Sequence, residues 1–207
     1  KLNPKRMILY FLDNHGEIIY DLLVTELLLE AGYKVSVVGR GELVRDDVTV
    51  KEAKKIIEGK YPDLKQIEGF RKAADRLRKF LEGGQLTVIT DGTYLLGADL
   101  NQSYKHPEFQ DAWRSAAAYI AKGMGNLHTL FSQRLSLAGL HNTMMKADNA
   151  YEILSKVKGR KITRRSDNDL AFIYQPKAQE YTKEISGGSL SEGGKSNSLN
   201  INKATQE

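Results

Sequence analysis

The residues best suited to chemistry follow the first apolar run of the chain. Residues 7–12 (MILYFL) form a short continuous apolar run, which is typical of a buried strand, and Asp13 and Asn14 come directly after it. A carboxylate and a carboxamide side by side offer the hard oxygen ligands that suit Mg²⁺ or a similar divalent ion. The alternative is that Asp13 or Asn14 only caps the helix expected after Gly16.

A second polar group follows the next predicted strand. Residues 34–38 (KVSVV) predict that strand, and the loop after it contains Gly-Arg-Gly at 39–41 and then Asp46 and Asp47. Asp47 is a candidate third oxygen ligand, because the carboxyl ends of neighbouring parallel strands lie at one edge of a sheet. The alternative is that Asp46 or Asp47 is the N-cap of the helix predicted over 50–58.

A lysine lies in a glycine-rich loop further along the chain. Residues 118–121 (AYIA) predict a strand, and Lys-Gly-Met-Gly-Asn at 122–126 leads from it into an expected helix. Lys122 and the two glycines favour a phosphate cradle at the start of that helix. The chain has no Gly-x-Gly-x-x-Gly after its first strand, so the dinucleotide fingerprint is absent.

The elements that must position these residues alternate along the chain. Helical spacing predicts helices, and apolar runs predict strands, in these ranges: helices over 17–31, 50–58, 63–81, 108–115 and 147–157, and strands over 7–12, 34–38, 86–90, 118–121 and 170–174. This alternation predicts an α/β protein, a three-layer α/β/α sandwich with a mainly parallel sheet. In such sheets ligands bind outside the carboxyl ends of the strands, where the polar residues above are expected.

Composition narrows the possible classes of protein. The chain has 207 residues, no cysteine and a net charge of +5, which excludes disulfides, thiolate metal sites and cysteine nucleophiles and favours an anionic partner. No apolar stretch is long enough for a membrane span and no signal segment is evident, so we expect a cytoplasmic protein without a membrane partner. Gly and Ser dominate from residue 186, which predicts an α/β domain over 1–185 and a flexible tail over 186–207.

Two other features of the sequence are interpreted without a binding role. Residues 156–165 hold six basic side chains in ten, but no aromatic residue lies among them and no nucleic-acid-binding motif accompanies them. A solvated turn is therefore favoured over a nucleic-acid partner. His106, His128 and His141 show no metal-ligand spacing and are predicted to be ordinary loop or helix residues.

Together these motifs resemble a known family. The run Asp-Asn-His-Gly-Glu at 13–17 is similar to the Asp-Asn-x-Gly-Glu motif of the metal-dependent, ARMT1-like damage-control phosphatases. The resemblance continues at 37–41, at 46–53, in Lys-Gly-Met-Gly-Asn at 122–126 and in Gln-Pro-Lys-Ala at 175–178. Family members carry a helical segment ahead of the first motif. Only twelve residues precede Asp13, so we expect this chain to lack most of that segment.

The resemblance implies a role for individual residues. Asp13, Asn14 and Asp47 match the divalent-metal ligands, with Mg²⁺, Mn²⁺, Co²⁺ or Ni²⁺ as the cofactor. Lys122 and Asn126 match phosphate-side residues, and Lys177 matches a late lysine that contacts the phosphate. Asp13 is also the candidate to orient or deprotonate the attacking water, and Lys122 to neutralise charge on the phosphoryl group. The sequence departs from the family pattern at Asp46, usually Asn, and at Met124, usually polar.

The resemblance also implies a function. It predicts a phosphatase that hydrolyses small phosphate monoesters, such as sugar phosphates or damaged phosphometabolites, so the expected partner is a small phosphorylated metabolite. The alternative is a non-catalytic module that uses the same fold to bind a phosphorylated ligand or an acidic partner.

Overall fold

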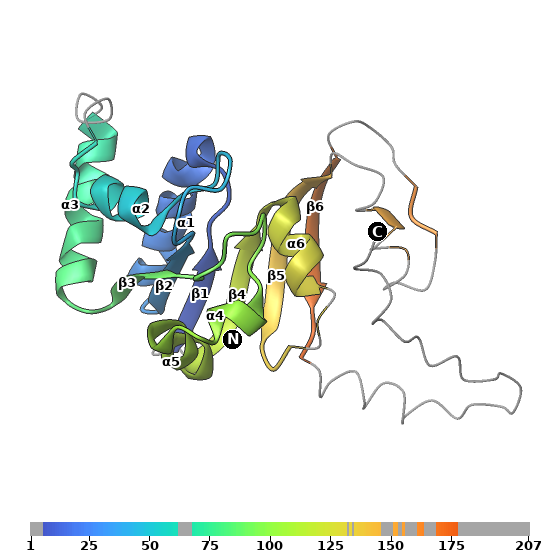
Figure 1. Ribbon diagram of the computed structural model, residues 1–207. Coiled ribbons are helices and arrows are strands. Elements are labelled where there is room, and N and C mark those ends of the chain that lie inside the picture. Colours follow the sequence, from blue (N-terminus) through green and yellow to red (C-terminus); the bar gives the residue numbers. More distant parts are fainter. Residues whose placement is uncertain are drawn as a thin grey trace, which may run out of the picture.

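The computed structural model describes residues 6–61, 68–131, 133, 135–145, 151–152, 155, 161–163 and 169–177 (Figure 1). Its strands are β1 (Met7–Phe11), β2 (Lys34–Gly39), β3 (Leu86–Thr90), β4 (Ala116–Lys122), β5 (Ala138–Met145) and β6 (Asp169–Gln175). Its helices are η1 (His15–Glu17), α1 (Ile18–Glu30), α2 (Val50–Ile57), α3 (Glu68–Glu82), α4 (Leu100–Ser103), α5 (Pro107–Ser115) and α6 (Gly123–Phe131). None of the helices in these residues has the length and apolar character that crossing a bilayer requires.

All six strands belong to one sheet with the order β3-β2-β1-β4-β5-β6. β1 to β5 run parallel, and β6 pairs antiparallel with β5. The chain builds outward from β1 through β2 to β3 and then returns to place β4 on the other side of β1. The carboxyl ends of β1 and β4 therefore flank the point where the strand order reverses, which is the usual ligand site of an open α/β sheet.

Side chains alternate between the two faces of the sheet, so each face has its own hydrophobic core. Phe11, Tyr119 and Ala121 face a core that includes Phe109 and Trp113 of α5. The opposite face packs against α1, α2 and α3, which lie together beside the β3–β2–β1 half of the sheet (Figure 1). A smaller cluster joins α6 to β5 and β6 through the side chains of Leu127, Phe131, Met145, Tyr151 and Ile173. The sheet is therefore covered by helices on both faces, which confirms the predicted fold class.

Most predicted elements agree with the structure within one to three residues at each end. The predicted helix over 63–81 appears as α3, with 63–67 outside the described residues. The helix over 147–157, the basic run 156–165 and the tail 186–207 also lie largely or wholly outside them. Sequence reasoning missed β5 because its sequence, AGLHNTMM, is neither a continuous apolar run nor a regular alternation.

Candidate metal and phosphate site

The segments that carry Asp13 and Asp47 are joined by backbone hydrogen bonds. Val48 N donates to Asp13 O at 2.8 Å and His15 N donates to Asp46 O at 2.7 Å, and between them Asn14 and Asp47 form an isolated bridge. The segment after β1 is thereby paired with the end of the β2–α2 loop. The structure thus brings Asp13, Asn14 and Asp47 to one edge of the sheet, where the sequence predicts them.

The capping alternatives for these residues fail in the structure. Thr49 is the N-cap of α2, and its side chain and that of Glu52 form a reciprocal capping box. Asp46 and Asp47 are therefore not required to begin that helix. Asn14 occupies the N-cap position of η1, but its side chain makes no capping hydrogen bond. The side chain of Asn14 therefore has no capping role, and Asp47 pairs with Arg40 instead of capping the helix.

Asp13 lies in a space that the glycine at 123 leaves open. Gly123 has a φ of +82°, and a Cβ built on it would come within 2.1 Å of the Asp13 carboxyl carbon. Any other residue at 123 would displace the carboxylate. Burial, followed by the charges of Asp47 and Glu17, raises the pKa of Asp13 to about 6. The proximity of these carboxylates therefore makes this position favourable for a cation.

A second group of charged residues surrounds Lys122 at the end of β4. Lys122 Nζ donates to Glu17 and, at 3.0 Å, to Asp21 Oδ1, which also accepts a hydrogen bond from the Tyr10 hydroxyl. We refer to Lys122, Glu17, Asp21 and Tyr10 as the Lys122 cluster. Burial opposes the charge on Lys122, but the bonds to Glu17 and Asp21 raise its pKa above the ordinary value. The ammonium is therefore charged and held at the edge of the site.

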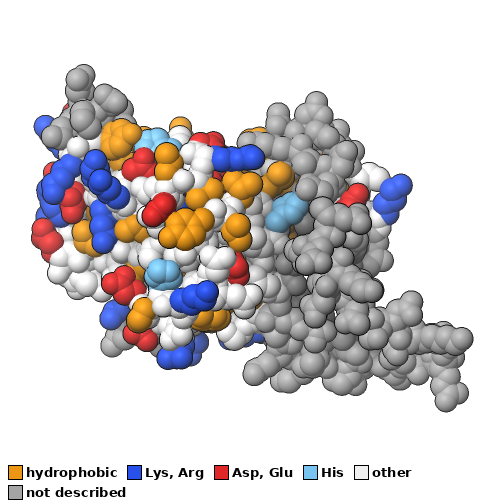
Figure 2. Space-filling model, viewed as in Figure 1, with side chains coloured by type: hydrophobic (Ala, Val, Ile, Leu, Met, Phe, Trp, Pro, Cys, Tyr) orange, Lys and Arg blue, Asp and Glu red, His pale blue; other side chains and the backbone are white. Residues whose placement is uncertain are grey.

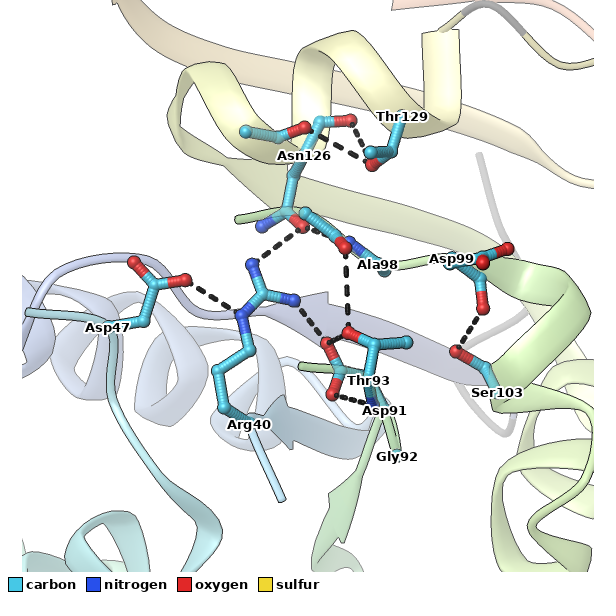
Figure 3. A network of polar contacts seen from close by, with 12 residues as sticks. Arg40, Asp47, Asp91, Gly92, Thr93, Ala98, Asp99, Ser103, Asn126 and Thr129 are labelled. Carbon is cyan, nitrogen blue, oxygen red and sulfur yellow. Dashed lines mark hydrogen bonds and ion pairs between the residues drawn. The ribbon is translucent and has the colours of Figure 1, made fainter. Parts of the chain in front are cut away.

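A third group, the Arg40 cluster, has the Arg40 guanidinium between Asp47 on one side and Asp91 and Asn126 on the other (Figure 3). Arg40 is almost fully buried. Its guanidinium donates to Asp47 Oδ2 at 2.7 Å, to Asp91 Oδ2 and, at 3.4 Å, to Asn126 Oδ1. Burial opposes ionisation of Arg40, but the charge of Asp91 and the bond to Asp47 raise its pKa. We define the Arg40 cluster as Arg40, Asp47, Asp91 and Asn126.

The structure gives Asn126 a full set of contacts within the protein. Its amide nitrogen donates to Leu12 O at 3.1 Å and Lys122 O at 2.8 Å, and its Oδ1 accepts from Ala98 N at 3.1 Å as well as from Arg40. The side chain is fully buried. Asn126 therefore ties the ends of β1 and β4 to the loop after β3, and its predicted contact with phosphate stays a prediction.

Lys177 is placed away from the other predicted residues. Gln175 at the end of β6 pairs with Gly139 at the start of β5, whereas Asn142 and Thr143 of β5 line the pocket near Asp13. Because β6 runs antiparallel, the chain after it leaves at the opposite edge of the sheet from the carboxyl ends of β1 and β4. The proposed site therefore does not include Lys177.

Four of the predicted residues, Asp13, Asn14, Asp47 and Lys122, line one pocket of about 640 Å³. Its polar end contains Asp13, Asn14, Glu17, Arg45, Asp46, Asp47 and Lys122. On the face shown in Figure 2, hydrophobic side chains lie exposed among charged ones across the middle of the molecule. Among the described residues that line the pocket, four carboxylates accompany two permanently cationic side chains. An anionic ligand would be repelled by this excess of negative charge unless a cation were bound there.

Sequence reasoning assigned no role to several residues of this site. Arg40 was noticed only as part of a Gly-Arg-Gly turn, and its burial against two aspartates depends on long-range packing. Glu17 is part of the Asp-Asn-x-Gly-Glu motif, so a signal for it was present in the sequence. Arg45 lines the pocket with a left-handed φ of 51°, a conformation that favours glycine. No sequence pattern marks Arg45.

The oxygen-rich end of the pocket fits a divalent ion. Asp13, Asn14 and Asp47 supply two carboxylates and one carboxamide, which are the hard donors that Mg²⁺ and Mn²⁺ accept. Among the described residues no group of three or more His, Cys, Asp or Glu side chains is placed to hold a metal ion, and Asp47 Oδ2 already accepts a hydrogen bond from Arg40.

One edge of the mostly parallel sheet thus carries the oxygen-bearing side chains of Asp13, Asn14 and Asp47 together with Lys122. The model of the damage-control phosphatase ARMT1-like domain matches residues 1–171. The chain belongs to this family, which confirms the resemblance seen in its motifs.

Individual relatives agree with this assignment. The chain is 30% identical over 124 residues to a damage-control phosphatase of Pyrococcus horikoshii, covering 59% of this chain and 34% of that protein. It is 30% identical over 125 residues to an uncharacterized protein of Methanocaldococcus jannaschii, covering 60% and 33%. A crystal structure of a DUF89 family protein from P. horikoshii superposes with a TM-score of 0.54 at 27% identity, covering 72% of this chain and 44% of that one. The matched region thus spans about a third of the curated relatives.

Proposed function

We propose that this chain carries the site of a divalent-metal-dependent phosphatase that hydrolyses small phosphate monoesters, the class that includes sugar phosphates and damaged phosphometabolites. The observation that carries the proposal is the acidic end of the pocket, where Asp13, Asn14 and Asp47 lie beside Lys122. A purely anion-binding site would contain an excess of cations. An excess of carboxylates beside a lysine fits a site that binds a metal and a phosphate together.

Each residue has a role that its surroundings support. Asp13, Asn14 and Asp47 would hold the ion, which when bound acts as a Lewis acid on a phosphate oxygen. Lys122 binds another phosphate oxygen and neutralises charge as the phosphoryl group transfers, exchanging its half-exposed partner Glu17 for the substrate. Asp13 orients the attacking water. Asn126 holds the ends of β1 and β4 at the spacing that these contacts need.

The cellular location is a further part of the proposal. We propose that the protein acts in the cytoplasm on free phosphorylated metabolites, which is consistent with the absence of cysteine from its sequence.

Phosphate release tests the proposal directly. Turnover is measured on a panel of phosphate monoesters with Mg²⁺, Mn²⁺, Co²⁺ or Ni²⁺ and after treatment with a chelator. We expect turnover that requires the metal and falls by about 100-fold or more in Asp13→Asn. Asp75→Asn is the matched control, because Asp75 is an exposed aspartate on α3 outside the pocket.

The alternative function, a non-catalytic binding module, leads to a different expectation. It predicts that a phosphorylated ligand raises the melting temperature without metal and without phosphate release. That result, with Asp13→Asn indistinguishable from the wild type, would overturn the phosphatase proposal.

A further inference from the structure

One half of one sheet face carries exposed apolar side chains. Ile120 of β4 packs against the core that includes α1, and it is paired in register with Leu140 of β5. Residues paired in register point to the same face of a sheet, so alternate residues of β5 and β6 continue the face on which α1 lies. Four large apolar residues on this part of the face are between 38% and 64% exposed: Leu140, Met144, Leu170 and Phe172. We call these four residues the open sheet face.

α1 borders the open sheet face and is apolar on its outer side as well. Asp21 of α1 contacts Lys122 of β4, which is paired with Asn142 of β5, so α1 lies one strand away from β5. Four residues at helical spacing, on the side of α1 opposite its buried residues, are between 41% and 70% exposed: Tyr20, Leu23, Val24 and Leu27. We call them the outer stripe of α1. A helix with apolar side chains all round is normally enclosed by other structure.

The outer stripe and the open sheet face together are larger than the apolar patches of most monomers. At these exposed fractions, the eight side chains present on the order of 900 Å² of surface. The largest apolar patch on a typical monomer covers about 300–600 Å². Sheets of parallel strands are, in addition, covered on both faces in nearly all proteins. The surface therefore indicates a macromolecular partner.

The shape of this surface favours a second copy of the same chain. α1 rises about 10 Å, one helix diameter, above the sheet. The face is therefore a step, with the outer stripe on its high side and the open sheet face on its low side. A two-fold axis parallel to the strands places the high side of each copy over the low side of the other. Such an interface buries on the order of 1,800 Å² in total, within the range of about 1,200–2,000 Å² that stable complexes bury.

Other occupants fit this surface less well. None of its eight side chains is charged, so a strongly acidic or basic partner would find no counter-charge there. The last residues of the chain, 186–207, are rich in Gly and Ser and contain no aromatic residue. They lack the continuous apolar stripe that a covering helix needs. A second copy offers two uncharged apolar surfaces that match in shape.

We propose that this surface is a homodimer interface, in which the outer stripe of α1 in each copy packs on the open sheet face of the other. The proposal is independent of the proposed phosphatase function. Met144 and Leu170 also line the pocket, so the interface borders the proposed site. The test variants are made at Leu27 and Phe172, which do not line it.

The mass of the full chain in solution tests the proposal. We expect light scattering to give twice 23.2 kDa for the wild type, with a dissociation constant in the micromolar range or below. Leu27→Glu and Phe172→Glu each bury an unpaired charge in the interface and are expected to weaken association by about 100-fold or more. Leu43→Glu is the control and should stay dimeric, because Leu43 is 72% exposed in the β2–α2 loop and belongs to neither surface. Urea denaturation checks that each variant is folded.

Cross-linking tests which surfaces meet. The chain has no cysteine, so introduced cysteines are the only thiols. In an equal mixture of Leu27→Cys and Phe172→Cys chains, a bifunctional maleimide is expected to join the two variants. A mixture of Leu43→Cys and Phe172→Cys chains is the control and should remain unlinked.

Three results would overturn the proposal. The first is a wild-type mass of one chain at concentrations well above the micromolar range. The second is a dimer whose mass neither glutamate variant changes. The third is a monomer in which removal of residues 186–207 increases the binding of the apolar dye ANS, because the tail would then be the occupant of this surface.

Discussion

Two cations, Arg40 and Lys122, lie near Asp13 in the proposed metal site, and they differ in what surrounds them. The Arg40 side chain is 3% exposed, and its guanidinium is bound by two buried aspartates and Asn126. The Lys122 side chain is 12% exposed, and one of its two carboxylate partners, Glu17, is 44% exposed. The Arg40 cluster is nearly closed to solvent and reaches the pocket through Asp47, whereas Lys122 and its partner Glu17 both line the pocket.

This difference separates a structural cation from a reactive one. A planar guanidinium can hold several acceptors in a fixed geometry, which suits the joint between the β2–α2 loop, the end of β3 and α6. An ammonium on a flexible chain can exchange a half-exposed carboxylate for a phosphate oxygen with little desolvation cost. The comparison predicts that loss of Arg40 mainly lowers stability and that loss of Lys122 mainly lowers activity.

The largest expected effect is on stability, in Arg40→Met. Removing the guanidinium leaves Asp47 and Asp91 buried without their counter-charge, so we expect the free energy of unfolding to fall by about 3–5 kcal/mol. Urea denaturation measures the change. Arg78→Met is the control, since Arg78 makes only an exposed pair with Asp75. A loss below about 1 kcal/mol would contradict the closed character of the cluster.

The next effect is on activity, in Lys122→Met. Loss of the charge that faces the transferring phosphoryl group is expected to lower kcat/KM about 100- to 1000-fold. The free energy of unfolding should fall less than in Arg40→Met, because Tyr10 still donates to Asp21 and Glu17 can turn to solvent. Steady-state kinetics and urea denaturation are measured on the same samples. A variant with near-normal kcat/KM would remove Lys122 from the proposed site.

Asn126→Ala tests whether Asn126 belongs with the structural or the reactive group. The substitution leaves Ala98 N and two carbonyl groups without their buried partner, so we expect a stability loss of about 2–3 kcal/mol. Thermal and urea unfolding measure this loss. If Asn126 contacts phosphate instead, kcat/KM will fall sharply while unfolding changes little, as the family resemblance implies.

The smallest effect concerns a buried group that has no charged partner in either cluster. His141 lies in β5, not in the predicted loop or helix, and its Nε2 contacts Tyr119 and Gln175. Burial lowers the pKa of His141 from 6.5 to about 4. Between these values the unfolded chain binds a proton that the native protein does not, so stability falls as the pH falls.

We expect the free energy of unfolding to drop by about 2 kcal/mol between pH 7 and pH 5 through His141. The measurement is the difference in pH dependence between the wild type and His141→Gln. If the two profiles run parallel over this range, His141 is not buried in its neutral form.

Local sequence was enough to predict much of the fold. The apolar run of β1 and the alternation of strands with helices depend on neighbouring residues, and both agree with the structure. The same reasoning missed β5 and gave no direction for β6. β5 forms because it lies between β4 and β6, and pairing with distant strands is not visible in its own residues.

The proposed site, like the fold, could be predicted from the sequence only in part. The residue types and their positions after the strands led to Asp13, Asn14, Asp47 and Lys122, because strand ends in a parallel sheet must share an edge. The sequence alone could not show that Arg40 is buried against Asp47 and Asp91. It also could not show that the antiparallel β6 carries Lys177 to the opposite edge of the sheet. The sequence by itself determined which chemical groups stand at the strand ends, and the tertiary structure decided which of them meet, because that depends on contacts between segments far apart in the chain.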